Sequence, residues 1–559
     1  MLRCCLVLLC SLCLLSGFSQ TLSIPVNDHR LLTDDELSMI LVQAHDLSAY
    51  GDLTGYDELM LTGPDGEYTF VQLPDALSHD TSYNVLHNSQ NYTLYFTPLP
   101  LLSVTADVDI PNDYKIAADF SYADEEQLFT SVVGIELRGG FSIDFPKKTY
   151  DLEFWQDETG AETLDAQFGD LRSDDDWILD ALYNEPLRLR SHVSHRLWLD
   201  IHTPGYESEE PEARAGADLR YVELFLNGRY NGLYNLSEQI DRKLLKLKKF
   251  NGNIRGELYK GATRNVGVVD FEVLTDYDNA LRSWSGYEYK YPSATDTTEW
   301  GLLHALKDFV INAPDAEFTA HVWDRFHYEN FLDYFIFLNL LRALDNTGKN
   351  IYVAKYQTGE PYFYVPWDLD GVFGTLHDGS EEFVSDDILA NEFHNRVIAL
   401  DPQNYSADVS ARWATLRETT LNEATLLGRF SAHYQFLSEN KLYEREAMVY
   451  PNYDFGNAHL DYLNDWLHDR LVFLDDYFGY TSNLSAPSVA GSITPFPNPA
   501  TDRINFPDTE PNQTYFLYDP TGKLLRHRTL DDGTISVGDL PAGFYFIHIG
   551  KKSGKFMVR

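Results

Sequence analysis

The sequence predicts an α+β protein that ends in a small all-β, sandwich-like module. A continuous apolar run from Phe331 to Leu341 is typical of a buried helix. It is followed by two β-branched and aromatic runs, 351–356 and 362–365, joined by Gln-Thr-Gly-Glu, which is typical of a hairpin. After residue 495 the chain alternates short β-rich runs with turn residues. The length of 559 residues and the apolar content of 44% indicate several domains with sizeable cores.

Residues 1–19 are predicted to be a secretory signal peptide. Arg3 precedes an apolar stretch, and small residues stand before a cleavage point after Ser19. The apolar stretch is too short to span a membrane, so we expect no transmembrane span in the mature chain. All four cysteines lie inside the peptide, which excludes disulfides, thiolate metal sites and a cysteine nucleophile from the mature chain.

The composition is strongly acidic. Asp and Glu number 86 against 43 Lys and Arg, which gives a formal net charge of −43. Such a chain repels nucleic acid and anionic membrane surfaces, so we expect neither as a partner. Most of these acids are expected to form a solvated surface, although calcium binding remains an alternative.

Residues 20–96 form a turn-rich segment that we expect to be β-rich and without chemistry of its own. The main domain is expected to span residues 97–480, with a linker at 481–494.

Strand-like runs at 101–108 and 132–137 lead to Arg138-Gly-Gly-Phe-Ser142, then to Phe145-Pro-Lys-Lys148 and a strand at 150–154. Glycines let the backbone approach a ligand, and Arg138, Ser142 and Lys148 are our candidates for holding phosphates. The alternative is an exposed turn with a charged edge.

The middle of the domain is expected to mix helices and hairpins. Asn227-Gly228 joins two runs, 221–226 and 230–236, as a tight hairpin. A basic run at 242–249 is expected to be the solvated face of a helix, with docking of an acidic substrate as the alternative. A strand at 256–261 is expected to turn Lys260 toward the cleft. Further helices are expected at 187–199, 298–310, 328–344, 409–437, 440–449 and 458–478.

The chemistry is expected in residues 342–374. Asp345 follows the apolar helix, and Asp345 with Asn350 has the Asp-x4-Asn spacing of a protein-kinase catalytic loop, in which Asp accepts the hydroxyl proton and Asn holds a metal. If the second hairpin strand persists, Asp368 and Asp370 point to one side and favour Mg²⁺. The alternative is a capping residue and two solvated acids at a strand end.

Three segments carry a resemblance to a known family: Asn350 through Val365-Pro-Trp-Asp-Leu-Asp370, the hairpin at 222–234, and Arg138-Gly139 with Phe145–Tyr150. They closely resemble the spore-coat-H (CotH) kinase family, an atypical, secreted branch of the protein-kinase-like fold. The resemblance covers roughly residues 97–480. It implies a two-lobed domain that binds ATP with Mg²⁺ or Mn²⁺, with Asp345 as catalytic base and Asn350, Asp368 and Asp370 at the metal.

The resemblance also indicates where this chain departs from the pattern. Gly140-Phe141-Ser142 replaces the usual Asn-Ser-Ser, so one polar contact to phosphate is lost. The helix at 187–199 offers only Glu185 and Asp200 at its ends, so the ordinary Lys–Glu pair is in doubt. Glu238 follows the hairpin where a kinase has its hinge; it is expected either to contact the nucleotide or to begin a helix as a favourable N-terminal acid.

The C-terminal module, residues 495–559, resembles a type IX secretion sorting domain. The resemblance lies in Pro497-Asn-Pro-Ala-Thr-Asp502, Tyr518–Lys523 and Leu540–Tyr545. It implies export by the type IX machinery, to the medium or to the outer-membrane surface.

Three functions are weighed on this basis. The first is a Ser/Thr protein kinase with an unidentified protein substrate, for which the scarcity of ATP outside the cell is a difficulty. The second is a catalytically inactive surface protein that keeps the fold for binding or structure. The third, a glycoside hydrolase with paired carboxylates, has no motif of its own.

Overall fold

The computed structural model describes residues 20–262, 271–481, 495–506, 513–518, 524–530, 533–549 and 552–559. The predicted signal peptide and nearly all of the predicted linker lie outside these residues. The chain divides into two compact units, one ending at Gly479 and one beginning at Tyr480. Among the described residues, no helix combines the length and the apolarity needed to cross a bilayer. The protein is α+β, as the sequence predicts.

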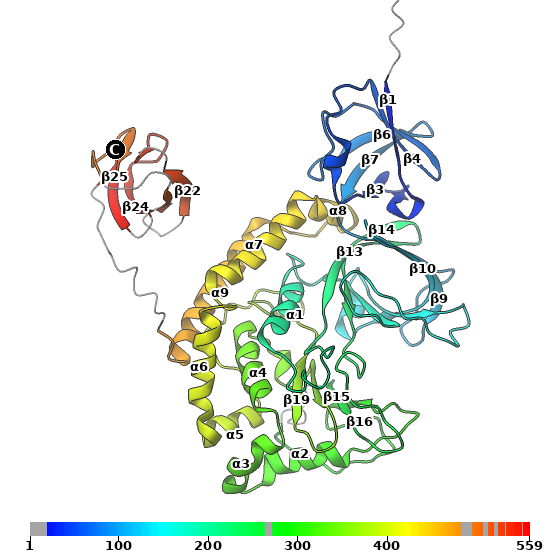
Figure 1. Cartoon of the computed structure of the whole chain (residues 1–559), viewed down its shortest axis with the longest axis vertical. Coiled ribbons are helices and arrows are strands. Elements are labelled where there is room, and N and C mark those ends of the chain that lie inside the picture. Colours follow the sequence, from blue (N-terminus) through cyan, green and yellow to red (C-terminus); the bar gives the residue numbers. More distant parts are fainter. Residues whose placement is uncertain are drawn as a thin grey trace, which may run out of the picture. The chain divides into compact units, whose positions relative to one another are not determined.

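The first unit begins with a seven-stranded mixed sheet in the order β1-β4-β5-β6-β7-β3-β2 (Figure 1). One face covers a core that contains Leu94, and the other face presents Met39 and Leu41 to the rest of the unit. The strands are β1 (Thr21–Pro25), β2 (Leu31–Asp34), β3 (Met39–Gln43), β4 (Glu58–Gly63), β5 (Gly66–Phe70), β6 (Tyr83–His87) and β7 (Gln90–Thr97).

A closed barrel follows, in the order β10-β11-β12-β14-β13-β8-β9. Its interior is filled by apolar side chains that include Phe120, Phe154 and Trp177. Asn227 and Gly228 both have positive φ, which is the geometry that a two-residue hairpin turn requires. The strands are β8 (Leu101–Thr105), β9 (Ile116–Ala123), β10 (Leu128–Arg138), β11 (Thr149–Trp155), β12 (Asp176–Asp180), β13 (Leu219–Leu226) and β14 (Arg229–Glu238).

A five-stranded sheet, β16-β17-β15-β18-β19, and the helices complete the unit. The sheet consists of β15 (Glu257–Gly261), β16 (Ser283–Trp284), β17 (Tyr287–Tyr291), β18 (Ile351–Lys355) and β19 (Tyr362–Pro366). The helices are α1 (Arg190–Ile201), α2 (Gly301–Asn312), α3 (Asp315–His321), α4 (Tyr328–Leu341), α5 (Glu392–Leu400), α6 (Tyr405–Arg417), α7 (Glu423–Glu439), α8 (Leu442–Val449) and α9 (Asn457–Tyr477).

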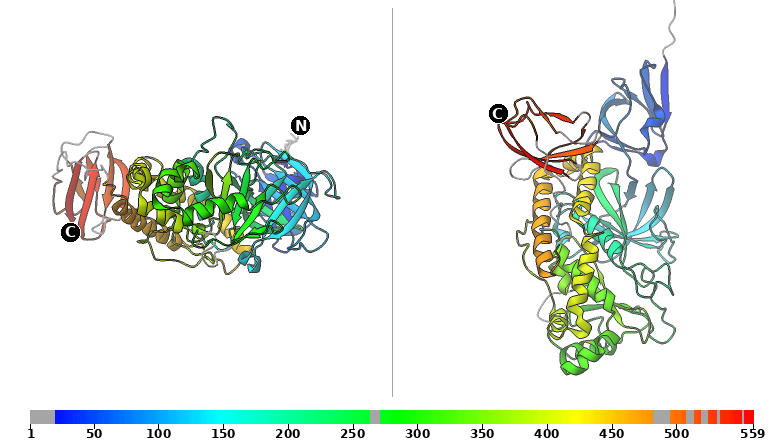
Figure 2. Two further views of the ribbon diagram at one scale, coloured as in Figure 1. Left: turned by 90° about the horizontal axis from the view of Figure 1, so that it is seen from below. Right: turned by 60° about the vertical axis from the view of Figure 1, so that its left-hand side comes forward.

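Helix α4 is the most deeply buried helix of the site region, because its side chains from Asn330 to Leu341 are all shielded from solvent. It packs against β19 on one side and against α6 and α9 on the other. Figure 2 shows most of the yellow and orange helices along one side of the unit, and the exception is α8, which packs on the barrel strand β14. This burial fixes the end of α4, from which the predicted catalytic loop departs.

Two predicted helices differ from the structure. Residues 242–246 form turns and residues 247–249 are irregular, so no helix is present, because Leu244, Leu245 and Leu247 are buried in a core cluster while Lys243 and Lys248 pair with nearby acids. The expected helix 409–437 is two helices, α6 and α7, with a break after Arg417.

The second unit is all-β in its described residues. β20 (Arg503–Asn505) pairs with β23 (Thr534–Ser536). A four-stranded sheet has the order β22 (Leu524–Leu530), β21 (Gln513–Tyr518), β24 (Gly543–Ile549) and β25 (Lys552–Val558). These strands enclose a core of their own, with Leu517, Ile547 and Val558 among its buried members.

Candidate active site

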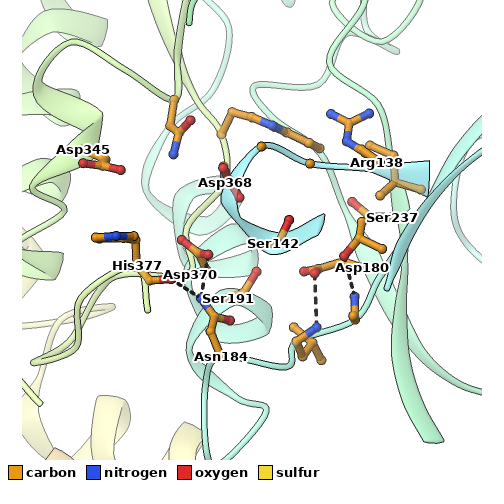
Figure 3. Close-up of a pocket in the computed structure, with 18 of the residues that line it drawn as sticks. Arg138, Ser142, Asp180, Asn184, Ser191, Ser237, Asp345, Asp368, Asp370 and His377 are labelled. Carbon is orange, nitrogen blue, oxygen red and sulfur yellow. Dashed lines mark hydrogen bonds between the residues drawn. The ribbon is translucent and has the colours of Figure 1, made fainter. Parts of the chain in front are cut away.

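A cavity of about 470 Å³ opens among the barrel, α1, the five-stranded sheet and the segment that follows α4 (Figure 3). This volume lies in the range of small-molecule and cofactor sites. The residues predicted from sequence that line it are Arg138, Ser142, Lys260, Asp345, Asn350, Asp368 and Asp370. Residues far apart in the sequence therefore meet at one cavity.

Asp345 stands at the cavity because α4 ends just before it. Arg342 adopts a left-handed backbone conformation with φ 51° and terminates the helix, and Asp345 begins a short 3-10 turn. Within that turn the buried Asn346 side chain donates to the carbonyls of Asn350 (2.7 Å) and Trp367 (2.8 Å). These two bonds join the turn to the end of β19 and hold Asp345 and Asn350 in fixed relation to the acids that follow the strand.

Asp368 and Asp370 share the cavity for a reason that differs from the predicted one. β19 ends at Pro366, and Asp368 has a left-handed backbone with φ 55°, so strand alternation does not persist. Asn184 instead positions the second acid, since its side-chain amide donates to Asp370 Oδ2 at 2.7 Å and to the carbonyl of His377 at 2.8 Å. Burial and the neighbouring Asp368 carboxylate raise the pKa of Asp370 well above its usual range.

Asp180 is an acid of the cavity that the sequence did not indicate. It ends β12 and lines the same space. Burial, together with repulsion from Asp368, raises its pKa to about 6. Carboxylates that disfavour one another in a partly closed space are stabilised by a cation that binds between them, so Asp180 adds to the negative potential at Asp368 and Asp370.

The opposite wall of the cavity is cationic. Arg138 ends β10, and its guanidinium lies 5.3 Å from the centre of the Trp367 ring and 2.8 Å from Asp151. Gly139 has φ 121°, and a Cβ there would stand 2.0 Å from Ser142 Oγ, so the loop requires glycine at this position. Lys260 comes from β15, and burial together with the nearby Arg138 lowers its pKa.

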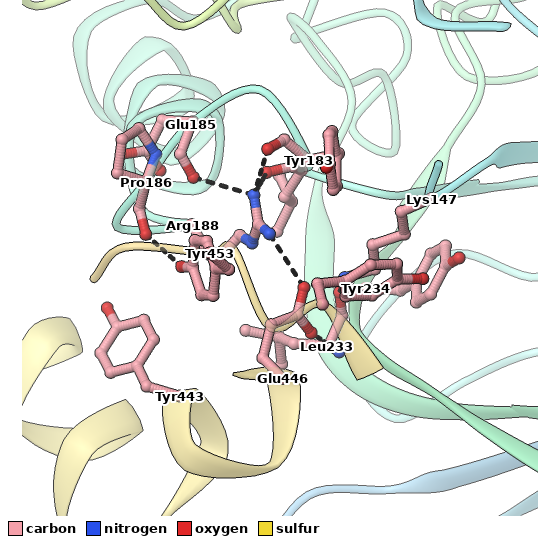
Figure 4. A network of polar contacts seen from close by, with 12 residues as sticks. Lys147, Tyr183, Glu185, Pro186, Arg188, Leu233, Tyr234, Tyr443, Glu446 and Tyr453 are labelled. Carbon is pink, nitrogen blue, oxygen red and sulfur yellow. Dashed lines mark hydrogen bonds and ion pairs between the residues drawn. The ribbon is translucent and has the colours of Figure 1, made fainter. Parts of the chain in front are cut away.

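Lys147 lines the cavity, whereas the predicted Lys148 does not. Lys147 is fully buried, and its ammonium lies 2.7 Å from Glu446 of α8 (Figure 4). Burial lowers its pKa to about 8. Lys148 instead donates to the carbonyls of Ile143 (2.6 Å) and Phe145 (2.5 Å), so the structure places its charge in a turn rather than at a ligand.

Glu238 also lies outside the cavity lining. Its buried carboxylate accepts hydrogen bonds from the backbone N–H groups of Arg172 (2.8 Å) and Asp218 (3.0 Å) and lies 3.4 Å from Arg214. No helix begins after it, because residues 242–246 form turns. Both roles expected for Glu238 therefore differ from the structure, in which this acid fastens the end of β14.

The cavity residues are of the kind that suits a hard divalent cation, because Asn350, Asp368 and Asp370, which carry amide and carboxylate oxygens, line the same space. Among the described residues, the group of three acids whose carboxylate oxygens lie within 4.8 Å of one another is a different one, Asp165, Asp174 and Asp175. That group is already matched by cations, since Lys243 lies 2.6 Å from Asp174 and also pairs with Asp175. The cavity is therefore the better candidate for a metal.

Comparison with known proteins gives two family matches. Residues 135–474, more than half of the chain, match the family described as CotH kinase protein. Residues 494–559 match the secretion system C-terminal sorting domain. Among curated proteins, the inner spore coat protein H of Bacillus subtilis (strain 168) is 22% identical over 247 residues, 43% of this chain and 59% of that protein. The chain thus spans less than two thirds of that relative's length.

Proposed function

Because the chain belongs to the CotH kinase protein family, we propose that it is a secreted atypical protein kinase that transfers the γ-phosphate of ATP to Ser or Thr of a protein substrate. One observation carries this proposal: Asp345, Asn350, Asp368 and Asp370 line one cavity together with Arg138 and Lys260. In this proposal the barrel with α1 forms the nucleotide lobe of a two-lobed kinase-like domain, and α4 belongs to the helical lobe.

Export is the part of this description that the comparisons support directly. The C-terminal sorting domain directs the protein to secretion and the cell surface. Handling by the type IX machinery follows from this domain, and the protein substrate is then expected outside the cell or along the export route.

In this proposal the cationic residues of the cavity bind the phosphates of ATP, and the acids with Asn350 bind its metal ion. Arg138, Lys147 and Lys260 supply positive charge to the phosphates, and Ser142 with the glycine loop approaches them closely. Asn350, Asp368 and Asp370 hold Mg²⁺ or Mn²⁺, which neutralises charge on the phosphates when bound. Asn184 keeps Asp370 in place. Positioning and charge neutralisation are the main requirements of phosphoryl transfer.

Asp345 is the group that we assign to the acceptor. It orients the substrate hydroxyl and takes its proton as the oxygen bonds to the γ-phosphorus of ATP, while the bond from that phosphorus to the bridging oxygen breaks and ADP leaves. Its position beyond the fixed end of α4 suits this role, because a base must be held within hydrogen-bond reach of the proton it removes.

In this proposal Lys147 is the nucleotide lysine, and Glu446 is its partner. The absence of an acid within the helix 187–199 favours an inactive protein, because kinases pair their nucleotide lysine with a glutamate. Here Glu446 of α8 lies 2.7 Å from Lys147 and also 2.9 Å from Arg188 (Figure 4). We propose that the Lys147–Glu446 pair replaces the ordinary lysine–glutamate pair of kinases. The lack of an acid in the helix 187–199 is then weaker support for a catalytically inactive protein.

The proposal is tested with the purified protein by calorimetric titration of ATP with Mg²⁺ or Mn²⁺ and by transfer of labelled phosphate to casein. We expect Asp345→Asn to keep ATP affinity within about twofold while transfer falls at least about 100-fold, because the base acts mainly in the transition state. Asp368→Asn is expected to lose the metal-dependent part of ATP binding.

The matched control is Asp465→Asn, which makes the same replacement of Asp by Asn at an exposed position of α9. It is expected to leave both binding and transfer unchanged. Metal-dependent ATP binding by the unaltered protein without transfer to any acceptor would favour the inactive surface protein instead. ATP binding that survives Asp368→Asn at full strength would contradict the metal assignment.

A further inference from the structure

The seven-stranded N-terminal sheet, residues 20–97, lies outside the segment that matches the kinase family, which begins at residue 135. Its second face is not exposed. Met39 and Leu41 of β3 and Tyr95 of β7 are buried in one cluster with Phe225 and Tyr230 of the β13–β14 hairpin. An apolar interface of this kind links the two parts more rigidly than a linker does.

The same face of the sheet also reaches α8. Met448 and Val449 of that helix pack on the cluster, and the hydroxyl of Tyr95 lies 3.9 Å from Met448 Sδ. The guanidinium of Arg445 stands 5.5 Å from the centre of the Tyr95 ring. α8 therefore lies with one side on the N-terminal sheet.

The other side of α8 is bound to the barrel by buried charges. Arg445 makes a two-pronged pair with Glu223 of β13, at 2.7 and 2.9 Å, and Tyr230 donates to the same carboxylate. The next residue, Glu446, contacts Lys147 at 2.7 Å and accepts from the backbone N–H of Leu233 at 2.8 Å. Hence a single short helix contacts the N-terminal sheet on one side and a lysine of the cavity on the other.

Polar contacts reinforce the junction. Asp34 of β2 is 1% exposed, and its carboxylate accepts a hydrogen bond from the backbone N–H of Tyr230 at 2.9 Å. The other oxygen of this carboxylate accepts from the backbone N–H groups of Glu36 and Leu37, so one buried acid joins the turn after β2 to the hairpin. The hairpin so fixed carries Tyr230, which donates to the carboxylate that pairs with Arg445, and Leu233, whose backbone N–H donates to Glu446 of α8.

We propose that the N-terminal sheet is a positioning element of the cavity: by packing on α8 and the β13–β14 hairpin it holds Glu446 and, through Glu446, the ammonium of Lys147. Met39, Leu41 and Tyr95 are the positioning residues. α8 has only eight residues, too few to be stable by propensity alone, so its order depends on its packing against this sheet, the β13–β14 hairpin and α7. The ATP-binding part of this inference rests on the proposed kinase function, whereas the placement of Lys147 does not.

The test uses the full purified chain and a matched pair of variants. Leu41→Ala and Leu94→Ala remove the same atoms from fully buried positions on adjacent strands. Leu41 faces the cluster with the hairpin, whereas Leu94 belongs to the sheet's own core. Two readouts are measured: acetylation of Lys147 by an amine-reactive ester, quantified by mass spectrometry against the half-exposed Lys349, and hydrogen exchange of the α8 amides.

We expect Leu41→Ala to raise Lys147 acetylation at least about fivefold and to speed exchange in α8, because local opening exposes what packing had covered. Leu94→Ala is expected to change both less than about twofold. Leu41→Val keeps most of the contact, so it should raise acetylation and exchange by a smaller factor than Leu41→Ala. This variant replaces Leu41→Ala in the test if the alanine variant does not fold. If ATP binds, its apparent Kd should rise in Leu41→Ala in proportion to the lost ordered population.

Equal changes in the Leu41 and Leu94 variants would overturn the proposal, because the effect would then report the general stability of the sheet. Unchanged acetylation and exchange in Leu41→Ala would overturn it as well. A protein that binds no ATP but shows the expected acetylation difference contradicts the kinase function and leaves the positioning role standing.

Discussion

At the scale of single residues, the buried network around Glu446 should dominate stability. Glu446→Gln removes the charge that lies between Lys147 and Arg188, both of which are fully buried. Two cations without a counter-charge in the interior cost about 3–5 kcal/mol. Urea unfolding of the purified protein measures this loss.

Glu444→Gln on the same helix is the control for that change. Its carboxylate is 54% exposed and pairs with Lys441 on the surface, so removing its charge should cost less than about 1 kcal/mol. A loss for Glu446→Gln no larger than for Glu444→Gln would show that the interior pair contributes little.

Asp180 provides a pH dependence of known sign. Its pKa rises from a usual value near 3.8 to about 6 because of burial and of Asp368. The folded protein then binds more protons than the unfolded chain between these values, so stability falls as pH rises from about 4 to about 6 and stays lower above that range. Asp180→Asn removes this penalty.

We therefore expect Asp180→Asn to raise the free energy of unfolding at pH 7.5 by up to about 3 kcal/mol, from the size of the shift. The gain should shrink toward pH 4. Urea unfolding at both pH values, in buffer with chelator, measures it. A gain that is equal at both pH values would indicate a packing effect instead of a titration.

The sequence predicted which acids line the cavity better than it predicted the residues that hold them in place. Asp345, Asn350, Asp368 and Asp370 were predicted from spacing and order within one short stretch, and all four line the cavity. Lys148 was predicted at the cavity, whereas Lys147 lines it. Neighbouring residues beside a strand can point in opposite directions, and sequence alone does not say which one faces inward.

Glu446 could not be found in the same way. It lies 299 positions from Lys147, and only the packing of α8 on the β13–β14 hairpin brings the two together. Asn184 is a similar case, because its bond to Asp370 joins residues 186 positions apart. Local patterns hold no information about such contacts.

At the scale of elements, a buried lysine of α2 packs against β16 and β17. Lys307 is 0% exposed, its ammonium lies 5.7 Å from the ring centres of Phe271 and Trp284 and 5.9 Å from that of Tyr287, and it donates to Ser285 at 3.2 Å. β17 carries Glu288 and Lys290 to the cavity, so the lysine stabilises one of its walls.

We expect Lys307→Met, which keeps the chain length and removes the charge, to weaken this contact by about 2 kcal/mol. The local result should be faster hydrogen exchange in residues 283–291. Asp308→Ala, at the neighbouring exposed position of α2, is the control and should leave that exchange as it was. Equal protection in both variants would show that the three rings hold the hairpin without the cation.

Secondary structure was predictable where periodicity and turn chemistry agree. α4, the β18–β19 hairpin and the Asn227-Gly228 turn satisfy both and are present. The basic run 242–249 has the composition of a solvated helix, but Leu244, Leu245 and Leu247 pack into a core cluster and Lys243 pairs with Asp174 and Asp175. Tertiary contacts there outweigh local propensity.

At the scale of the whole molecule, two compact units carry separate tasks. The second unit has its own core and matches the sorting domain, while every residue of the cavity belongs to the first unit. Since an element with its own core folds largely by itself, loss of the second unit should leave the first one intact. A truncation that removes the second unit should therefore abolish export and leave ligand binding in the cavity unchanged.

We expect a chain ending at residue 481 to remain inside the cells that produce it, whereas the full chain appears at their surface or in the medium. The purified truncated chain should keep its thermal midpoint within about 2 °C and its ATP affinity within about twofold, because the sorting unit supplies no residue of the cavity. Cell fractionation with immunoblotting measures the first outcome, and differential scanning calorimetry with ATP titration measures the second.

The control removes only β25, which breaks the sheet of the sorting unit while most of the unit's length remains. Loss of export in that variant with unchanged ATP affinity would assign transport to the folded sorting unit, and a fall in affinity in either variant would contradict the independence of the two units.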